Sequence, residues 1–198
     1  MKDRNLSGPA IFMYSTIAVM IAIALVSFVA YYGGFTDVNA VLWTGVVSFM
    51  IVYHFGTRLF LGALSKHWGI TYKHPFFKSL PFEKKLYKVL RVRQWRDKVL
   101  TFEPDEFLLS KRTLPEIANT MAKAEVDHWM NQGISIVAIF FSLIWGEFPV
   151  FLITSVAAML FDAQFIVVQR FNRPKVVRLI EGKEKKLKNK LRYETTNA

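Results

Sequence analysis

Glu125 and His128 are the two residues whose types and spacing best fit acid–base chemistry. They lie near the end of a segment whose start, Thr113-Leu114-Pro115-Glu116, has the features of a helix N-terminus. These features are a capping threonine, a proline in the first turn and a glutamate placed for a capping box. At about 100° per residue, both side chains fall on an apolar helix face with Leu114, Ile117, Ala118, Met121 and Trp129. Burial without a partner costs a polar group a few kcal/mol, so both groups need partners.

Three interpretations of this pair are open from the residues alone. The pair joins its helix to a neighbouring element and does no chemistry. Alternatively it is an acid–base dyad, in which Glu125 holds one imidazole nitrogen of His128 and the other nitrogen takes a hydroxyl proton. A metal site fits least well, because a carboxylate-bridged two-metal bundle needs the E-x-x-H pattern twice and this chain has it once. We therefore predict no metal.

The composition is typical of a small membrane protein. The chain has 198 residues, of which 53% are hydrophobic, and 26 Lys and Arg against 15 Asp and Glu give a net charge of +11. This length predicts a single domain, residues 1–198. The chain has no cysteine, which excludes disulfides, thiolate metal sites and a cysteine nucleophile. It also lacks the P-loop, dinucleotide and serine-elbow motifs of common soluble enzymes.

Four apolar stretches approach the ~20 residues that a bilayer-spanning helix needs. They cover about residues 9–32, 38–64, 133–148 and 149–168. We expect the first to be a retained span and not a signal peptide, because it lacks a small-residue cleavage site. The predicted fold class is an all-α integral membrane protein with four transmembrane helices and cytoplasmic amphipathic helices between spans 2 and 3.

The distribution of basic residues predicts the orientation. The polar segment 65–132 carries 13 Lys and Arg and the tail 170–198 carries 10, whereas the turns 33–37 and 146–149 carry none. The positive-inside rule then places both termini and the long segment in the cytoplasm. Cations placed against a bilayer predict membrane lipids as partners and no nucleic acid.

The long cytoplasmic segment is expected to lie on the membrane. Tyr72–Phe82 interleaves aromatic residues with lysines between prolines, which suits the headgroup region. Glu83–Val99 mixes apolar and basic residues and predicts a basic amphipathic helix on the membrane surface. Electrostatic anchoring to anionic lipid explains its charge without any further role. The basic tail is expected to be a solvated or lipid-touching helix end.

Arg58 and Asp162 are ionisable residues inside predicted spans, and such residues normally have partners. Arg58 lies 6 residues before Leu64 and Asp162 lies 8 residues before Arg170. At ~1.5 Å per residue both are about 9–12 Å from the cytoplasmic end of their spans. We therefore predict that they form a structural pair between the second and fourth spans.

Four separated motifs resemble one family. They are Phe77-Lys78-Ser79 with Phe82-Glu83-Lys84, Val92-Arg93-Gln94-Trp95-Arg96-Asp97-Lys98-Val99-Leu100, Ala124-Glu125-Val126-Asp127-His128-Trp129, and Val168-Gln169-Arg170-Phe171-Asn172-Arg173-Pro174. Their order and spacing are similar to those of the glycosyl-4,4'-diaponeurosporenoate acyltransferases, over roughly residues 56–179. These are small bacterial membrane enzymes that esterify a fatty acid onto the sugar of a glucosylated carotenoid acid.

The resemblance implies roles for particular residues. His128 would be the general base toward the acceptor hydroxyl, and Glu125 would orient it. Basic and amide residues near the membrane surface would grip the phosphates of an acyl-CoA or phospholipid donor; they are Arg93, Lys98, Gln169, Arg170, Asn172 and Arg173. The same arginines would equally serve to anchor helix ends to lipid headgroups. No cofactor is implied beyond the acyl donor.

Two functions of different classes follow from these observations. The first is a membrane-embedded acyltransferase that moves a fatty acyl group onto a hydroxyl of a lipid-linked sugar, such as a glycosylated carotenoid acid, in glycolipid synthesis. The alternative is a non-catalytic lipid-binding or scaffold protein of a membrane biosynthetic complex. The Glu125/His128 pair discriminates them, because an enzyme that loses it keeps its partners and loses turnover.

Overall fold

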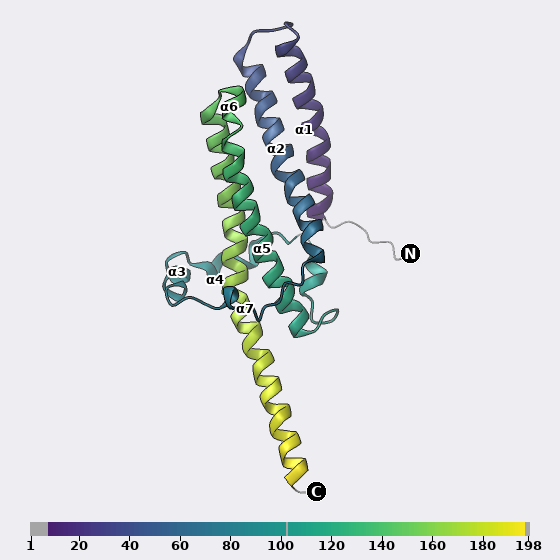
Figure 1. The fold of residues 1–198 in the computed structure, drawn as a ribbon, viewed down its shortest axis with the longest axis vertical. Coiled ribbons are helices and arrows are strands. Elements are labelled where there is room, and N and C mark those ends of the chain that lie inside the picture. Colours follow the sequence, from purple (N-terminus) through teal and green to yellow (C-terminus); the bar gives the residue numbers. More distant parts are fainter. Residues whose placement is uncertain (1–7, 102, 197–198) are drawn as a thin grey trace, which may run out of the picture. The chain divides into compact units, whose positions relative to one another are not determined.

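The computed structural model describes residues 8–101 and 103–196 (Figure 1). These residues form helices joined by turns and contain no strand, so the predicted all-α class holds for the described part of the chain. Contacts divide the chain into two compact units. The first unit falls within residues 1–68, 100–102 and 127–164, and the second within residues 69–99, 103–126 and 165–198. Lys2 and Arg4, which contribute to the predicted basic start, lie outside the described residues.

Helices α1 (Gly8–Tyr32) and α2 (Asn39–Leu64) pack side by side in the first unit (Figure 1). No charged residue interrupts α1, and Gly34 adopts a positive φ of 76° just beyond its end. That conformation is favourable for glycine and lets the Phe35 N–H bond back to the Ala30 carbonyl at 3.0 Å. Large apolar side chains of α1 point outward, for example Val26, which is 70% exposed. Such an apolar surface favours a lipid environment over water.

Three helical segments are long and apolar enough to cross a membrane, among the residues that the structure describes. They are Gly8–Tyr32, Asn39–His67 and Phe148–Thr196, the last being helix α7. The fourth span predicted at residues 133–148 is not among them. Instead, residues 133–139 continue helix α5 (Leu114–Ile139), and the short helix α6 (Ser142–Trp145) follows before α7. The first part of the apolar run is thus the end of a longer amphipathic helix, because no helix break separates it from Trp129.

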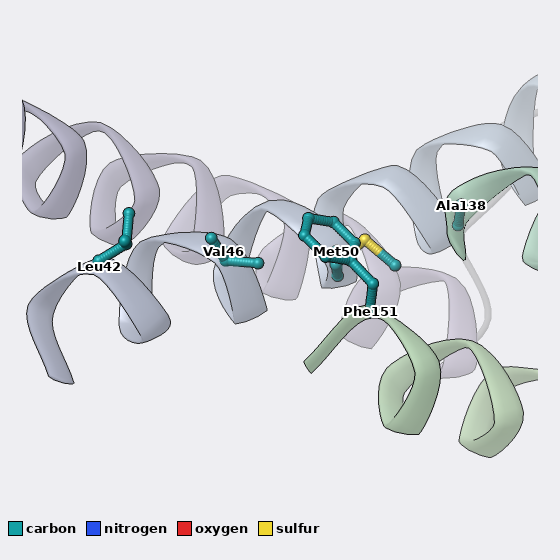
Figure 2. Packing of buried hydrophobic residues seen from close by; sticks show 5 residues of the cluster. All are labelled: Leu42, Val46, Met50, Ala138 and Phe151. Carbon is teal, nitrogen blue, oxygen red and sulfur yellow. The ribbon is translucent and has the colours of Figure 1, made fainter. Parts of the chain in front are cut away.

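The apolar core of the first unit lies where α2 meets α5 and α7. It consists of Leu42, Val46, Met50, Ala138 and Phe151, and Figure 2 shows Met50 beside the Phe151 ring. Partly buried aromatic residues surround this core, namely Phe28, Tyr31, Phe49, Tyr53, Phe141 and Trp145. This packing holds the three helices that carry the polar residues described below.

The second unit contains short helices in place of the single surface helix that the sequence predicts over residues 83–99. Helix α3 (Glu83–Val89) is followed by Arg91 with a left-handed φ of 50°, and then by α4 (Val92–Trp95) and the 3-10 turn η3 (Arg96–Lys98). The indole N–H of Trp95 donates to the Leu90 carbonyl at 2.8 Å, which satisfies a carbonyl at the end of α3. The turn buries Val92 completely. The other 3-10 turns among the described residues are η1 (Ser65–His67), η2 (Pro75–Phe77) and η4 (Pro104–Phe107).

Helix α5 begins as its sequence predicts. The backbone N–H of Thr113 donates to the Glu116 carboxylate at 2.7 Å, and the Glu116 N–H faces the Thr113 hydroxyl at 3.5 Å. This reciprocal capping box is the predicted one. It lowers the pKa of Glu116, chiefly through the hydrogen bond from the Thr113 backbone.

Candidate functional site

Asp162 is the centre of a polar cluster inside the first unit. Its side chain on α7 is fully buried, and three side chains contact its carboxylate. The Nδ1 atom of His128 on α5 lies 2.8 Å from Oδ1, and the Asn131 amide donates to the same oxygen at 3.1 Å. Arg58 on α2 forms an ion pair with Oδ2. The structure therefore brings the predicted pair Arg58 and Asp162 together with the predicted base His128.

Backbone contacts fix the helices that carry this cluster. Arg58 donates to the His54 carbonyl at 2.8 Å, one turn back on α2, and to the Ala158 carbonyl of α7 at 3.5 Å. The Gln132 side chain of α5 donates to the Met159 carbonyl of α7 at 2.8 Å. Each of these bonds joins a side chain to a backbone group one turn from the Asp162 carboxylate or its partners. The arrangement is thus tied to the helix register and not to mobile loops.

The geometry leaves His128 suited to proton transfer. A carboxylate on Nδ1 selects the tautomer in which Nδ1 carries the hydrogen and Nε2 the lone pair. The His128 side chain is 21% exposed, whereas that of Asp162 is fully buried. The imidazole is therefore partly accessible from outside, while the carboxylate that orients it stays buried. This is the arrangement in which a histidine acts as a general base and a buried carboxylate stabilises the imidazolium that forms.

Two further polar groups of this unit were not singled out from the sequence. Both ring nitrogens of His54 are buried and have no hydrogen-bond partner among the described residues, and the same holds for the Asn131 carbonyl oxygen. Buried polar atoms without partners are uncommon and call for a water or a ligand group. The sequence does mark His54 as unusual, because it is a polar residue inside an apolar span, one turn before Arg58.

Glu125 has different partners from those that the sequence predicts. Within the second unit its buried carboxylate accepts from Arg170 at 2.6 Å and forms an ion pair with Arg173. Arg170 also pairs with Glu83 at 2.5 Å. The carboxylate on His128 Nδ1 is thus Asp162, and Glu125 neutralises two arginines. Helical periodicity correctly placed Glu125 and His128 on one face of α5. However, Glu125 meets arginines on that face, whereas His128, about one turn later, meets Asp162.

Arg170 and Arg173 were predicted to grip donor phosphates, and the structure occupies them internally. Besides the two glutamates, Arg170 donates to the Lys78 carbonyl at 3.1 Å and Arg173 donates to the Phe77 carbonyl at 3.0 Å. Arg173 is almost fully buried and lies 4.7 Å from the Phe77 ring centroid. These arginines hold the 75–79 turn and helices α3 and α5 against α7.

Glu83 completes this ion network and was missed as a site residue. It is buried at the start of α3, and it accepts a hydrogen bond from the Tyr87 hydroxyl at 2.9 Å. Burial and this hydrogen bond raise the pKa of Tyr87, so the phenol remains a donor at physiological pH. A lone glutamate opening a lysine-rich helix was the available sequence signal.

The remaining predicted binding residues lie on the second unit. Arg93 and Lys98 are exposed, and Gln169 is half-buried on α7. Asn172 accepts a hydrogen bond from Arg96 at 2.9 Å. Across residues 8–101 and 103–196 no group of three His, Cys, Asp or Glu side chains gathers into a metal site.

The fold and the site define a class: an all-helical protein with membrane-length apolar helices and a histidine held by a buried carboxylate. The chain belongs to the glycosyl-4,4'-diaponeurosporenoate acyltransferase family, whose model matches residues 73–182. Comparisons with curated proteins and with solved structures gave no match. The family match includes His128 and Asp162 and leaves Arg58 outside. Acyl transfer is therefore the reaction class that the family supports for this chain.

Proposed function

We propose that this chain is a membrane-embedded acyltransferase whose general base is His128, held by Asp162. The observation that carries the proposal is the 2.8 Å contact between His128 Nδ1 and the buried Asp162 carboxylate, inside the segment that matches an acyltransferase family. The acyl group moves to a hydroxyl of a lipid-linked sugar. The family name favours a glycosylated carotenoid acid as that acceptor.

The reaction needs one proton acceptor and one acyl carbonyl. The hydroxyl oxygen of the sugar attacks the carbonyl carbon of the acyl donor. At the same time the hydroxyl proton passes to Nε2 of His128. A new C–O ester bond forms, and the tetrahedral intermediate breaks the C–S bond of a thioester or the C–O bond of a phospholipid ester. His128 then returns the proton to the leaving thiolate or alkoxide. No serine or cysteine nucleophile is required.

The neighbours of Asp162 keep it in the form that this step requires. Arg58 forms an ion pair with the carboxylate, and Asn131 donates a hydrogen bond to it at 3.1 Å. A buried carboxylate with such partners stays ionised, because the opposite charge and the hydrogen bonds favour the charged form. An ionised Asp162 stabilises the imidazolium of His128 during the transfer, as in other carboxylate–histidine pairs.

Acyl-CoA and phospholipid are the two donor classes that fit this chemistry, and neither calls for a metal or redox cofactor. Transfer between two acyl bonds involves no change of oxidation state. The other partners that we propose are membrane lipids and the lipid-borne acceptor, with no nucleic acid. The apolar outer surface of α1 and the basic segments on either side of the apolar helices support this lipid setting.

We propose that both termini face the cytoplasm of a bacterial cell membrane, with residues 133–148 supplying a fourth crossing in addition to the three long apolar segments. The chain has no cysteine, so single cysteines can replace the exposed residues Asp37, Phe148 and Lys186. An impermeant thiol reagent added to whole cells should label the first two positions and spare the third. Labelling of the position 186 variant in intact cells contradicts this orientation.

Mass spectrometry of lipid and pigment extracts tests the function itself. Cells that make the wild-type chain should contain an acylated glycolipid that is absent from cells making His128→Gln at the same level. His67→Gln is the matched control, because His67 is an exposed histidine outside the cluster. Equal amounts of product in the His128→Gln cells would instead favour a lipid-binding or scaffold protein.

A further inference from the structure

Two basic residues of the second unit contact Phe171 and Asn172, and a third lies close to one of them in the sequence. The Arg96 guanidinium donates to the Asn172 side-chain oxygen at 2.9 Å and lies 5.3 Å from the Phe171 ring centroid. The Lys175 ammonium lies 3.6 Å from the same centroid and 3.5 Å from the same amide oxygen. Arg93 precedes Arg96 by three residues, and burial, together with charge repulsion from Arg96 and Arg93, lowers the pKa of Lys175.

This basic cluster differs from the neighbouring arginines in how its charge is balanced. Arg170 and Arg173 are neutralised by the buried carboxylates of Glu83 and Glu125. By contrast, Arg96 and Lys175 share the neutral amide of Asn172. Asp97 lies 3.3 Å from Arg96 Nε, but its side chain is 77% exposed, so solvent screens this pair.

Gathering like charges costs free energy, and the fold supplies contacts that hold them in place. The Phe171 ring lies within cation–π distance of both Arg96 and Lys175, and it forms a T-shaped pair with the Tyr87 ring, with centroids 5.2 Å apart. The Asn172 oxygen orients both cationic groups at once. A rigid set of cations with a net positive charge is preorganised for an anion.

We propose that Arg93, Arg96 and Lys175 bind a phosphate group of the acyl donor. Arginine presents a planar fork that matches phosphate oxygens, and lysine adds a compact point charge. Both donor classes of the proposed function carry this group, coenzyme A in its diphosphate and 3'-phosphate and a phospholipid in its headgroup. That the bound phosphate belongs to the acyl donor rests on the proposed function. The anion site itself rests on the contacts of Arg96 and Lys175 with Phe171 and Asn172.

Asn172→Asp is the sharpest test, because it keeps the shape and places a carboxylate between Arg96 and Lys175. Neutralising two crowded cations should leave the melting temperature of the chain unchanged or raise it. The same change should weaken phosphate binding by about tenfold or more. The new carboxylate competes with the phosphate for Arg96 and Lys175, so the phosphate loses about one charge-assisted hydrogen bond. Higher stability with weaker binding is the signature of a ligand site, because a purely structural cluster would gain stability and leave anion binding unaltered.

The binding assay uses the purified full chain in neutral detergent and two soluble probes. Coenzyme A represents the thioester donor, and dihexanoyl phosphatidylglycerol below its micellar concentration represents the phospholipid donor. Weaker binding of either probe by Asn172→Asp supports the site and identifies the donor class. Lys185→Gln, which removes an exposed charge farther along α7, should bind as the wild type does.

Two results overturn the inference: no binding of either probe to the wild type, or affinities of Asn172→Asp within twofold of wild type. If Asn172→Asp fails to fold, the double variant Arg96→Gln/Lys175→Gln is judged by the same criterion. The assay is independent of turnover, so the two proposals fail separately. Unaltered probe affinity in an active enzyme contradicts the phosphate site alone, and probe binding without acyl transfer contradicts the proposed function alone.

Discussion

Replacing Asp162 by asparagine removes a buried negative charge and keeps the shape of the side chain. Arg58 then keeps its charge without its carboxylate partner, and an amide N–H₂ has to face either that guanidinium or the His128 ring. Arg58→Gln produces the converse defect, in which the carboxylate of Asp162 loses its cation. Breaking a buried ion pair from one side costs on the order of 3–5 kcal/mol.

The double variant Arg58→Gln/Asp162→Asn should be much more stable than the sum of the two single changes predicts. Two neutral amides can hydrogen-bond to each other, and Arg58 and Asp162 are only 10% and 0% exposed in the wild type, so solvent screens their interaction little. For groups in direct contact we expect a coupling free energy of about 2 kcal/mol. Arg58 also donates hydrogen bonds to the carbonyls of His54 and Ala158. Arg58→Gln removes these bonds both alone and in the double variant, so they do not contribute to the coupling free energy.

Unfolding of the four proteins in mixed detergent micelles, followed by tryptophan fluorescence, measures this coupling. The exposed pair Lys190 and Glu194, with 3.8 Å between the charged atoms, provides the control cycle. Its coupling should stay below about 0.5 kcal/mol, as expected for a surface i,i+4 pair. A coupling for Arg58 and Asp162 no larger than that of the control would refute the assignment of this pair as a buried stabilising contact.

Three further predictions concern the helices that carry the site. Glu125→Gln should destabilise the fold by about 3 kcal/mol, because Arg170 and Arg173 lose a buried countercharge. The kcat of the folded enzyme should fall less than tenfold. Thermal unfolding and turnover, measured on the same preparation, separate the two effects. Gly45→Ala should lower stability by about 1–3 kcal/mol in a chemical denaturation series, because its Cβ would lie 2.9 Å from the Phe28 ring; a neutral effect would mean that the ring moves freely. The folded pKa of Glu116 is lowered, so its contribution is present above the unfolded pKa and is lost as pH falls through the folded pKa. Wild type should therefore be more stable than Glu116→Gln at pH 6, and the difference should shrink as pH falls below about 4.3, the ordinary glutamate pKa, and vanish once Glu116 is protonated; a difference that persists there contradicts the stabilising role of the Glu116 charge.

Local chemistry and periodicity predicted the parts of the fold that depend on a single segment. The capping residues predict the start of α5, and long, mostly apolar runs predict α1, α2 and the first half of α7. The end of α5 was not predictable in this way, since an apolar run of 16 residues fits the last turns of a long helix as well as a short span. The break at Arg91 likewise depends on the Trp95 indole reaching the Leu90 carbonyl, which a helical pattern does not reveal.

The site shows the same division between local and tertiary information. Equal depth in their helices was sufficient to place Arg58 beside Asp162. The partner of His128 was not accessible, because Glu125 and Asp162 both carry a carboxylate and only the tertiary register decides which one reaches the ring. Sequence spacing pointed to the histidine but assigned its carboxylate to Glu125, the acid on the same apolar helix face.

The turnover of His128→Gln tests the central claim most directly. Wild type, His128→Gln and His67→Gln are reconstituted in liposomes with acyl donor and glycolipid acceptor, and kcat is measured at equal amounts of folded protein. General base catalysis typically contributes 10²–10⁴-fold. We therefore predict that His128→Gln loses at least about 100-fold in kcat while His67→Gln retains the wild-type rate. A kcat of His128→Gln within threefold of wild type would contradict the assignment of His128 as the base.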